Sequence, residues 1–404
     1  MSAPAASEAP SATPAKPSAL RRFFALDPLD NRYPALHGVR FFAILSVVQY
    51  HVTGVFKRLH GPELNEDLSQ LSTRIFFGMD LFFILSGFLI GSILIYAHDQ
   101  HGKLNAPRFY LRRMFRTFPS YYVILTILAL TKPLTRHELG NLPFEYAFLT
   151  NFTKLGSEQL VMGWGWSLSI EEQFYLVAPL LFWLLFRLPS NRARIVFLLG
   201  TWSLGTVVRL GIWLSKPAWT NMDFMHATYF RTYTRFDTII CGILLALVQI
   251  RYGEAIGRWL MHPFHRALVA IPGVACLWVL LHPAVFDAAP FMLSRVFLWG
   301  TFTCVMYFSA ILLLLHSDNT FTRFLSAPLF RRLATLGYGV YLVHVPILEF
   351  LMPAANALDA RGVSTFVIWG LALVAVMLLA LVVGYVMHIL IEKPALRLRQ
   401  RMAG

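Results

Sequence analysis

The stretch HGVRFFAILSVVQYH, residues 37–51, decides how the rest of the chain is interpreted. It is apolar enough to enter a bilayer, yet it contains Arg40 and His51, eleven residues apart. Eleven residues turn an α-helix through about 1100°, so the two side chains project from nearly the same side, about 16 Å apart along the axis. Ionisable groups inside a spanning helix usually face a protein interior or a wet cavity, which indicates a functional site. The alternative is that Arg40 extends to the lipid headgroups and His51 only bonds a neighbouring helix.

The composition is that of a membrane protein. Of the 404 residues, 57% are hydrophobic and 14% are charged, whereas about a quarter of the residues of soluble domains are charged. The net charge of +14 comes from basic residues in short clusters between apolar runs, which is the positive-inside pattern rather than a nucleic-acid-binding one. Cys241, Cys276 and Cys304 lie in apolar segments without metal-ligand spacing, so neither a disulfide nor a zinc site is predicted.

The apolar segments predict an all-α, polytopic integral membrane protein with about ten transmembrane helices. The expected spans are 35–56, 76–97, 119–136, 170–187, 195–214, 237–250, 267–283, 292–315, 335–352 and 366–390, of which the sixth and seventh are short or interrupted. Residues 1–31 are expected to form a disordered Ala/Pro/Ser-rich tail without a signal peptide, and 395–404 a short basic tail. The membrane domain is expected to cover 32–394. Basic clusters in alternate loops predict that both termini are cytoplasmic.

The segment GMDLFFILSGFLI, residues 78–90, predicts a second helix with a small surface at Ser86 and Gly87, where another helix can approach closely. Asp80 lies near the outer end of this helix. Two interpretations are open: Asp80 meets His51, or it caps the helix N-terminus.

Arginines recur every fourth residue at Arg108, Arg112 and Arg116, and so form one stripe on a predicted helix. Guanidinium groups suit phosphate oxygens because they can bind two of them at once. The stripe therefore indicates phosphate binding, with simple topological anchoring as the alternative.

Two later stretches also contain polar residues in apolar surroundings. In WGWSLSIEEQFYLVAP, residues 164–179, Ser169 and Glu172 fit a capping box, whereas Glu171 has no such explanation. The stretch LGYGVYLVH, residues 336–344, ends in His344, which alone is more typical of a buried structural histidine than of a catalyst.

Together these stretches resemble the membrane acyltransferase type 3 family. Arg40 and His51 match its Arg-x10-His signature, residues 78–90 its second-helix motif, and Arg108 to Arg116 its arginine-rich motif. Residues 166–179 match its tryptophan–serine–glutamate motif, with Glu171 at the family's glutamate. Weaker later motifs match at 235–242 (RFDTIICG), 336–344 and 392–394 (EKP). The resemblance runs from about residue 32 to residue 394, in the family's order.

The resemblance implies a ten-helix enzyme of the bacterial inner membrane that moves an acyl group, usually acetyl from acetyl-CoA, onto a hydroxyl of a carbohydrate or related product. Some members add an extracellular SGNH domain, which is not expected here. The expected partners are the lipid bilayer, acyl-CoA as co-substrate and the hydroxyl acceptor, with no nucleic acid, metal or tightly bound cofactor. The acceptor and the acyl chain length stay open.

Site residues follow from the resemblance and from the chemistry of each side chain. His51 is expected to be the general base, or alternatively a transient acyl-histidine, with Asp80 or Glu171 orienting its ring. Acyl-CoA is expected to bind Arg40, Arg108, Arg112, Arg113 and Arg116. The expected substrate-binding or structural residues are Ser86, Trp166, Ser167, Tyr175, Arg235, Asp237 and His344. The competing hypothesis is a secondary transporter with a His/Asp/Arg proton relay, although no internal repeat supports it.

Overall fold

The computed structural model describes residues 26, 29–60, 77–153, 159–282, 296 and 298–403, and all regular elements in these ranges are helical. Nine helices of the described chain are long and apolar enough to cross a membrane, and α13 (Trp299–Leu315) is apolar but shorter. The predicted all-α polytopic membrane fold is therefore confirmed. The predicted disordered tail, residues 1–31, lies almost entirely outside the described residues.

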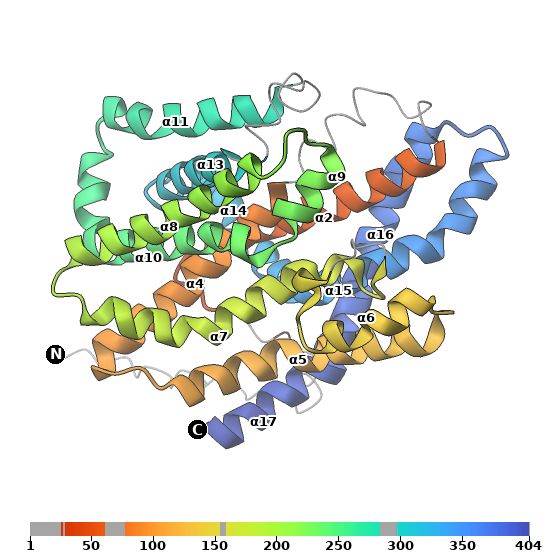
Figure 1. The fold of residues 1–404 in the computed structure, drawn as a ribbon, viewed down its shortest axis with the longest axis horizontal. Helices are drawn as coiled ribbons and strands as arrows, with labels where there is room; N and C mark the ends of the chain where they lie inside the picture. Colours follow the sequence, from red (N-terminus) through yellow and green to blue (C-terminus); the bar gives the residue numbers. More distant parts are fainter. Residues whose placement is uncertain are drawn as a thin grey trace, which may run out of the picture.

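The long helices make up most of the bundle (Figure 1). They are α2 (Ala35–His60), α4 (Gly78–His101), α5 (Ala106–Thr131), α7 (Trp166–Arg187), α8 (Asn191–Leu214), α10 (Thr232–Trp259), α11 (Pro263–Leu281), α15 (Pro328–Asp359) and α16 (Thr365–Met387). The shorter ones are α6 (Arg136–Tyr146), α9 (Asn221–Phe224), α14 (Thr320–Leu325) and α17 (Lys393–Ala403). A π-helical turn, His388–Glu392, joins α16 to α17.

Most predicted spans have different limits in the structure, and the third, sixth and ninth differ most. The ninth was expected over 335–352, but α15 runs over Pro328–Asp359. The third was expected to begin at residue 119, but α5 begins at Ala106, where Asn105 caps it by accepting from the backbone N–H of Arg108. The arginine stripe therefore belongs to the spanning helix itself. The sixth was expected to be short, yet α10 is one continuous helix of 28 residues, because its charged C-terminal turns continue the helix beyond the apolar part.

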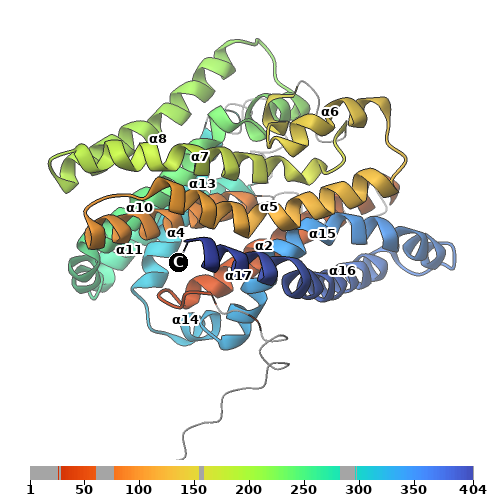
Figure 2. The ribbon, with the colours of Figure 1, turned by 90° about the horizontal axis from the view of Figure 1, so that it is seen from below.

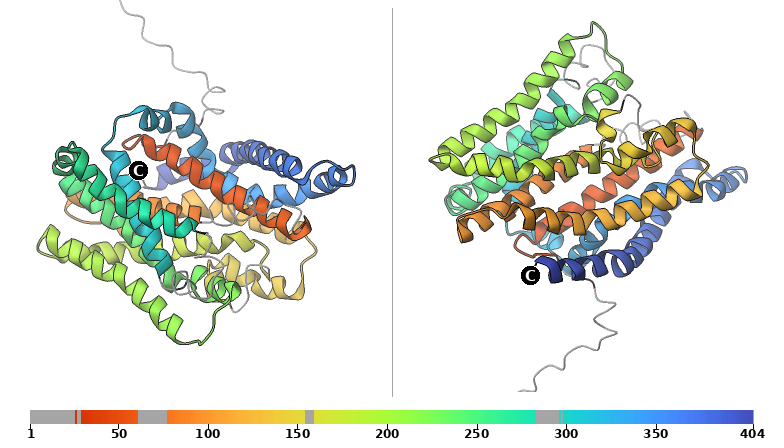
Figure 3. Two further views of the ribbon diagram at one scale, coloured as in Figure 1. Left: turned by 90° about the horizontal axis from the view of Figure 1, so that it is seen from above. Right: turned by 60° about the horizontal axis from the view of Figure 1, so that its bottom comes forward.

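The first long helix, α2, packs along one side against α4, α15 and α16 and crosses the face of the bundle that is seen from above (Figure 3, left). This position explains how a helix with polar residues is accommodated, because those residues face protein rather than lipid. The C-terminal helix α17 runs along α5 at the lower side of the bundle (Figure 2).

The closest helix contact joins α4 to α10. A Cβ added at Gly87 would lie 2.0 Å from the carbonyl oxygen of Ile239, and one added at Gly242 would lie 2.0 Å from the carbonyl oxygen of Ile84. No side chain fits at these two positions, so the helices meet backbone to backbone. The predicted close approach at Ser86 and Gly87 is confirmed, and its consequence is a rigid α4–α10 pair behind the site.

Candidate active site

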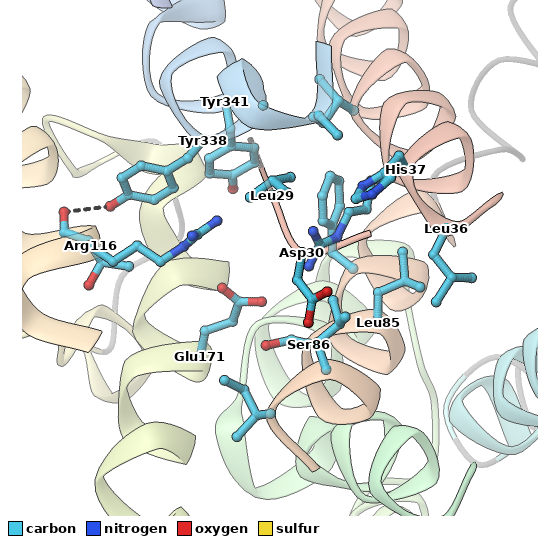
Figure 4. Close-up of a pocket in the computed structure, with 18 of the residues that line it drawn as sticks. Leu29, Asp30, Leu36, His37, Leu85, Ser86, Arg116, Glu171, Tyr338 and Tyr341 are labelled. Carbon is cyan, nitrogen blue, oxygen red and sulfur yellow. Dashed lines mark hydrogen bonds between the residues drawn. The ribbon is translucent and has the colours of Figure 1, made fainter. Parts of the chain in front are cut away.

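A cavity of about 290 Å³ opens between α2, α4, α5, α7 and α15. Arginines line it at Arg32, Arg40, Arg113 and Arg116, together with His37; Asp30 and Glu171 are its acids, and Ser86, Ser167, Tyr175, Tyr338 and Tyr341 supply hydroxyls. In Figure 4 Glu171 and Ser86 lie across the cavity from Tyr338 and Tyr341. The cavity is thus a mainly basic chamber that also holds hydroxyl groups.

The structure divides the predicted arginine stripe into two parts. Arg113 and Arg116 line the cavity together with Arg40 of α2, whereas Arg108 and Arg112 are exposed and lie outside it. Residues three and four apart share a helix face, so the cavity face of α5 runs through Arg113, Arg116 and Thr117. Arg113 is therefore a cavity residue that the every-fourth-residue pattern did not single out.

Glu171 faces this basic chamber. The Tyr175 hydroxyl bonds the Ser86 hydroxyl at 2.9 Å and reaches a Glu171 carboxylate oxygen at 3.5 Å. Arg40 and Arg113 both lie within electrostatic range of the Glu171 carboxylate. The predicted site residues Ser86, Glu171 and Tyr175 are thus brought together, and they form the acidic and hydroxyl side of the cavity.

The predicted capping box at Ser169 and Glu172 is wrong. Helix α7 begins at Trp166, and its cap, Gly165, supplies no side-chain hydrogen bond. Ser169 therefore lies within the helix, where its hydroxyl bonds the Thr150 hydroxyl at 2.8 Å. The pattern was misleading because the helix starts four residues earlier than the capping motif suggested, with Gly165 rather than Ser169 as its N-cap.

One wall of the cavity is held by hydroxyls of α15. The Tyr341 hydroxyl donates to the Trp164 carbonyl at 2.5 Å and lies 2.6 Å from the Ser167 hydroxyl. The Tyr338 hydroxyl donates to the Thr117 carbonyl at 2.9 Å (Figure 4). Ser167 is thereby brought to the cavity, whereas Trp166 packs its ring on Tyr229 behind it, at 5.0 Å between centroids.

His51 and His344 form a pair beyond the Tyr341 turn. The His344 Nε2 lies 3.2 Å from the His51 Nδ1, and the ring centroids are 4.9 Å apart. On α2, His51 follows the cavity residue Ile44 by seven residues, which is about two turns and about 10.5 Å further along the same face. On α15, His344 lies one turn after Tyr341. The pair thus continues two cavity-lining helix faces away from Arg40.

Asp80 is buried in an ion pair with α10. Its carboxylate lies 2.6 Å from an Arg235 guanidinium nitrogen and accepts the Trp299 indole N–H at 3.1 Å. Arg235 also stacks over the Tyr229 ring, 4.7 Å from its centroid. Phe77, not Asp80, is the N-cap residue of α4, so the capping interpretation is wrong. The structure does not bring Asp80 to His51 in any described contact; it brings Asp80 to Arg235.

A second buried ion pair lies beside the first. The Arg209 guanidinium of α8 lies 2.7 Å from the carboxylate of Asp237, and the two side chains are 3% and 0% exposed. Sequence reasoning selected Asp237 and Arg235 but did not identify Arg209. An arginine within the apolar run of α8 was the signal that could have indicated a buried acidic partner.

Glu145 is another buried acid that sequence reasoning missed. Its two carboxylate oxygens accept the backbone N–H groups of Val161 and Met162, each at 2.8 Å. Burial raises the pKa of Glu145, which lies in α6 outside the spans, to about 7. This residue fixes the loop that leads into Trp164 and Ser167, and so it supports the cavity wall from behind.

The described part of the chain contains no evident set of side chains that could bind a metal ion. In these ranges no group of three or more His, Cys, Asp or Glu side chains is placed to hold a metal ion. Cys241, Cys276 and Cys304, all described, are free thiols.

The fold and the site agree with the comparisons to known proteins. The model of the acyltransferase domain family matches residues 33–386, and the chain belongs to this family of membrane acyltransferases. The basic cavity and the histidine pair therefore lie in a member of this acyltransferase domain family.

Several relatives are similar to the chain over most of its length. YrhL of Bacillus subtilis, provisionally named a peptidoglycan O-acetyltransferase, is 28% identical over 340 residues, covering 80% of this chain and 50% of that protein. The O-acetyltransferase OatA of Staphylococcus aureus is 26% identical over 337 residues, covering 79% and 51%. The peptidoglycan O-acetyltransferase OatA of Listeria monocytogenes is 24% identical over 353 residues, covering 79% and 50%. The chain spans about half the length of these relatives. No solved structure matches it.

Proposed function

We propose that this chain is a bacterial inner-membrane O-acyltransferase that moves an acetyl group from cytoplasmic acetyl-CoA to a hydroxyl of a carbohydrate or related cell-surface product. The observation that carries the proposal is the basic cavity whose α2 and α15 faces lead to the His51–His344 pair. The names of the relatives favour a glycan acceptor of the peptidoglycan type. The positive-inside pattern favours cytoplasmic termini and a cytoplasmic donor.

The basic surface at the mouth of the cavity supports an anionic donor. Arg399 of α17 lies close enough to Arg112 and Arg116 of α5 for their charges to act on it. In the described part of the chain none of these arginines has an acidic partner. Like charges held together without a counter-ion favour binding of an anion, and phosphate suits guanidinium groups best. We assign the coenzyme A phosphates to this surface and the pantetheine arm to the cavity.

His51 supplies the chemistry in this proposal. Its ring nitrogen takes the proton of the acceptor hydroxyl while the hydroxyl oxygen attacks the thioester carbonyl carbon. The C–S bond then breaks, and the departing sulfur takes the proton back from His51, which yields the ester and free coenzyme A. Histidine suits both transfers because its unperturbed pKa lies near neutrality. Glu171 and the neighbouring arginines are then donor-side groups rather than partners of His51.

The function is tested with the purified protein in lipid nanodiscs. We expect labelled acetyl groups from acetyl-CoA to appear as alkali-labile esters on a peptidoglycan or glycan acceptor. Samples without an acceptor serve as the control for simple hydrolysis. A chain that carries substrates across vesicle membranes but never forms an ester would instead support the transporter hypothesis.

The arginine surface is expected to act on donor binding. Arg116→Ala and Arg399→Ala should each raise the KM for acetyl-CoA roughly tenfold with little change in kcat, because each removes a charge-assisted contact worth about 1.5 kcal/mol. Lysine at either position should rescue only part of the loss. Arg397→Ala, on an exposed position of the same helix, is the matched control. Equal KM values for acetyl-CoA in all variants would contradict donor binding by these arginines and support simple topological anchoring.

A further inference from the structure

We propose that His344 is a positioning residue for His51. It keeps the proton of the neutral His51 ring on Nδ1, so that Nε2 is the basic nitrogen. It also stabilises the cation that forms when the His51 Nε2 takes a proton. The proposal rests on the proposed function, in which His51 removes the acceptor proton. The sequence suggested only a buried structural histidine at 344. The geometry of the pair points to a more specific role.

The two rings lie in a chain of hydrogen-bonding groups with a carbonyl at each end. The His344 Nδ1 lies 2.6 Å from the Tyr341 carbonyl oxygen, and its Nε2 lies 3.2 Å from the His51 Nδ1. That His51 nitrogen also lies 2.9 Å from the Val47 carbonyl oxygen. His344 is 1% exposed.

The carbonyl groups determine where the ring protons lie. A carbonyl oxygen can only accept, so the His344 Nδ1 beside Tyr341 carries a proton. In the neutral ring the His344 Nε2 is then an acceptor. The His51 Nδ1 faces two acceptors, the His344 Nε2 and the Val47 oxygen, and therefore also carries a proton. The remaining nitrogen of neutral His51, Nε2, holds the lone pair that can take a proton from a hydroxyl.

The same arrangement stabilises the cation that the reaction produces. When the His51 Nε2 takes a proton, the positive charge spreads to the Nδ1–H, which lies within hydrogen-bond distance of two acceptors, the His344 Nε2 at 3.2 Å and the Val47 carbonyl oxygen at 2.9 Å. A hydrogen bond to a charged group is stronger than one between neutral groups, so His344 stabilises the charged state more than the neutral one. In serine hydrolases a carboxylate does this work. His344 has no carboxylate in its described contacts and is itself the acceptor.

His344 also restrains the His51 ring. Trp164 and Tyr341 pack around the His344 ring at centroid distances of 6.2 Å and 5.5 Å. The His344 Nδ1 bond to its own helix backbone fixes the direction of its Nε2. A fixed acceptor on one side of His51 leaves one orientation of that ring preferred, which is the requirement for a positioned base.

Two variants separate this role from packing. His344→Leu keeps a buried side chain of similar size but removes the acceptor. We expect kcat to fall about 100-fold, which is the lower end of the usual contribution of a general base, with the KM for acetyl-CoA unchanged. His344→Gln places an amide oxygen near the position of the lost nitrogen, and we expect it to recover most of that loss. His316→Leu, at a partly buried histidine outside the cavity that bonds Gln249 at 2.9 Å, is the matched control for deleting a histidine.

Nitrogen NMR of protein labelled with 15N-histidine supplies a readout that does not depend on activity. We expect the neutral His51 ring to carry its proton on Nδ1 in the wild type. In His344→Leu the Val47 carbonyl oxygen is the acceptor that remains at Nδ1, so we expect this preference to weaken. A wild-type His51 protonated on Nε2 would overturn the proposal, whether or not acyl transfer is detected. A full kcat in His344→Leu would overturn it as well. Failure of the proposed function alone would appear as no transfer by the wild type, with the NMR result unaffected.

Discussion

His51→Gln is expected to abolish acyl transfer while the protein stays folded and still binds acetyl-CoA. Glutamine keeps a hydrogen-bonding group at this position, next to His344, but it cannot take a proton at neutral pH. Loss of a general base typically lowers the rate by about 10²–10⁴-fold, well outside assay error. Donor binding is expected to persist because Arg40 and His51 are about 16 Å apart along α2. Turnover and donor affinity measured in the same nanodiscs test both statements.

A structural role for His51 would give the opposite pattern. Glutamine would then be largely functional, and alanine would reduce the amount of folded protein. Arg116→Ala is the informative comparison, because it is expected to change donor KM and leave kcat. Substantial turnover in His51→Gln would refute the assignment of His51 as the base, because the glutamine side chain cannot take the proton of the acceptor hydroxyl.

Asp80→Ala is expected to give the largest loss of stability of any single change considered. It leaves the Arg235 guanidinium buried, 3% exposed, without its carboxylate partner. Breaking a buried ion pair by removing one member costs about 3–5 kcal/mol. We expect little folded protein after detergent extraction, which thermal unfolding measures. The molecules that do fold are expected to have wild-type turnover, which an assay of the monodisperse fraction measures.

An exposed ion pair in the same chain is the matched control. Arg251 contacts Asp99 through two hydrogen bonds of 2.9 Å and 2.6 Å, but both side chains are partly exposed. Asp99→Ala should cost only about 0–1 kcal/mol. The double variant Asp80→Leu with Arg235→Met should recover much of the stability, because it removes both charges together. A stably folded Asp80→Ala protein with low kcat would instead support the predicted catalytic role of Asp80.

The sequence was sufficient for features that depend on one segment at a time. Apolar length predicted the spans, and the small residues Ser86 and Gly87 predicted the close contact that α4 makes with α10. The periodicity of the arginines placed them on one helix. Each of these properties is local, because it needs only the rise and the angular step of a helix.

The sequence was not sufficient for partners that come from distant segments. Helical spacing identified Asp80 as unusual but not its partner, since periodicity indicates a face and not the helix that covers it. The same limit applies to His344, which was considered alone until the structure placed it 3.2 Å from His51. Arg113 was included only through its neighbours, because the side of α5 that faces the cavity depends on α2 and α7.

The buried Asp80–Arg235 pair has a consequence for the biosynthesis of this protein. The two residues are 155 positions apart, so at a synthesis rate of about 5–20 residues per second, Asp80 emerges from the ribosome about 8–30 s before Arg235. The cost of a carboxylate in an inserting helix reaches about 2.5–3.5 kcal/mol at the helix centre, whereas Asp80 lies in the first turn of α4. During this interval Asp80 can be accommodated by protonation or by water at the membrane interface. The ion pair can form only after α10 has been synthesised, so we expect the packing of α4 to be completed late in membrane assembly.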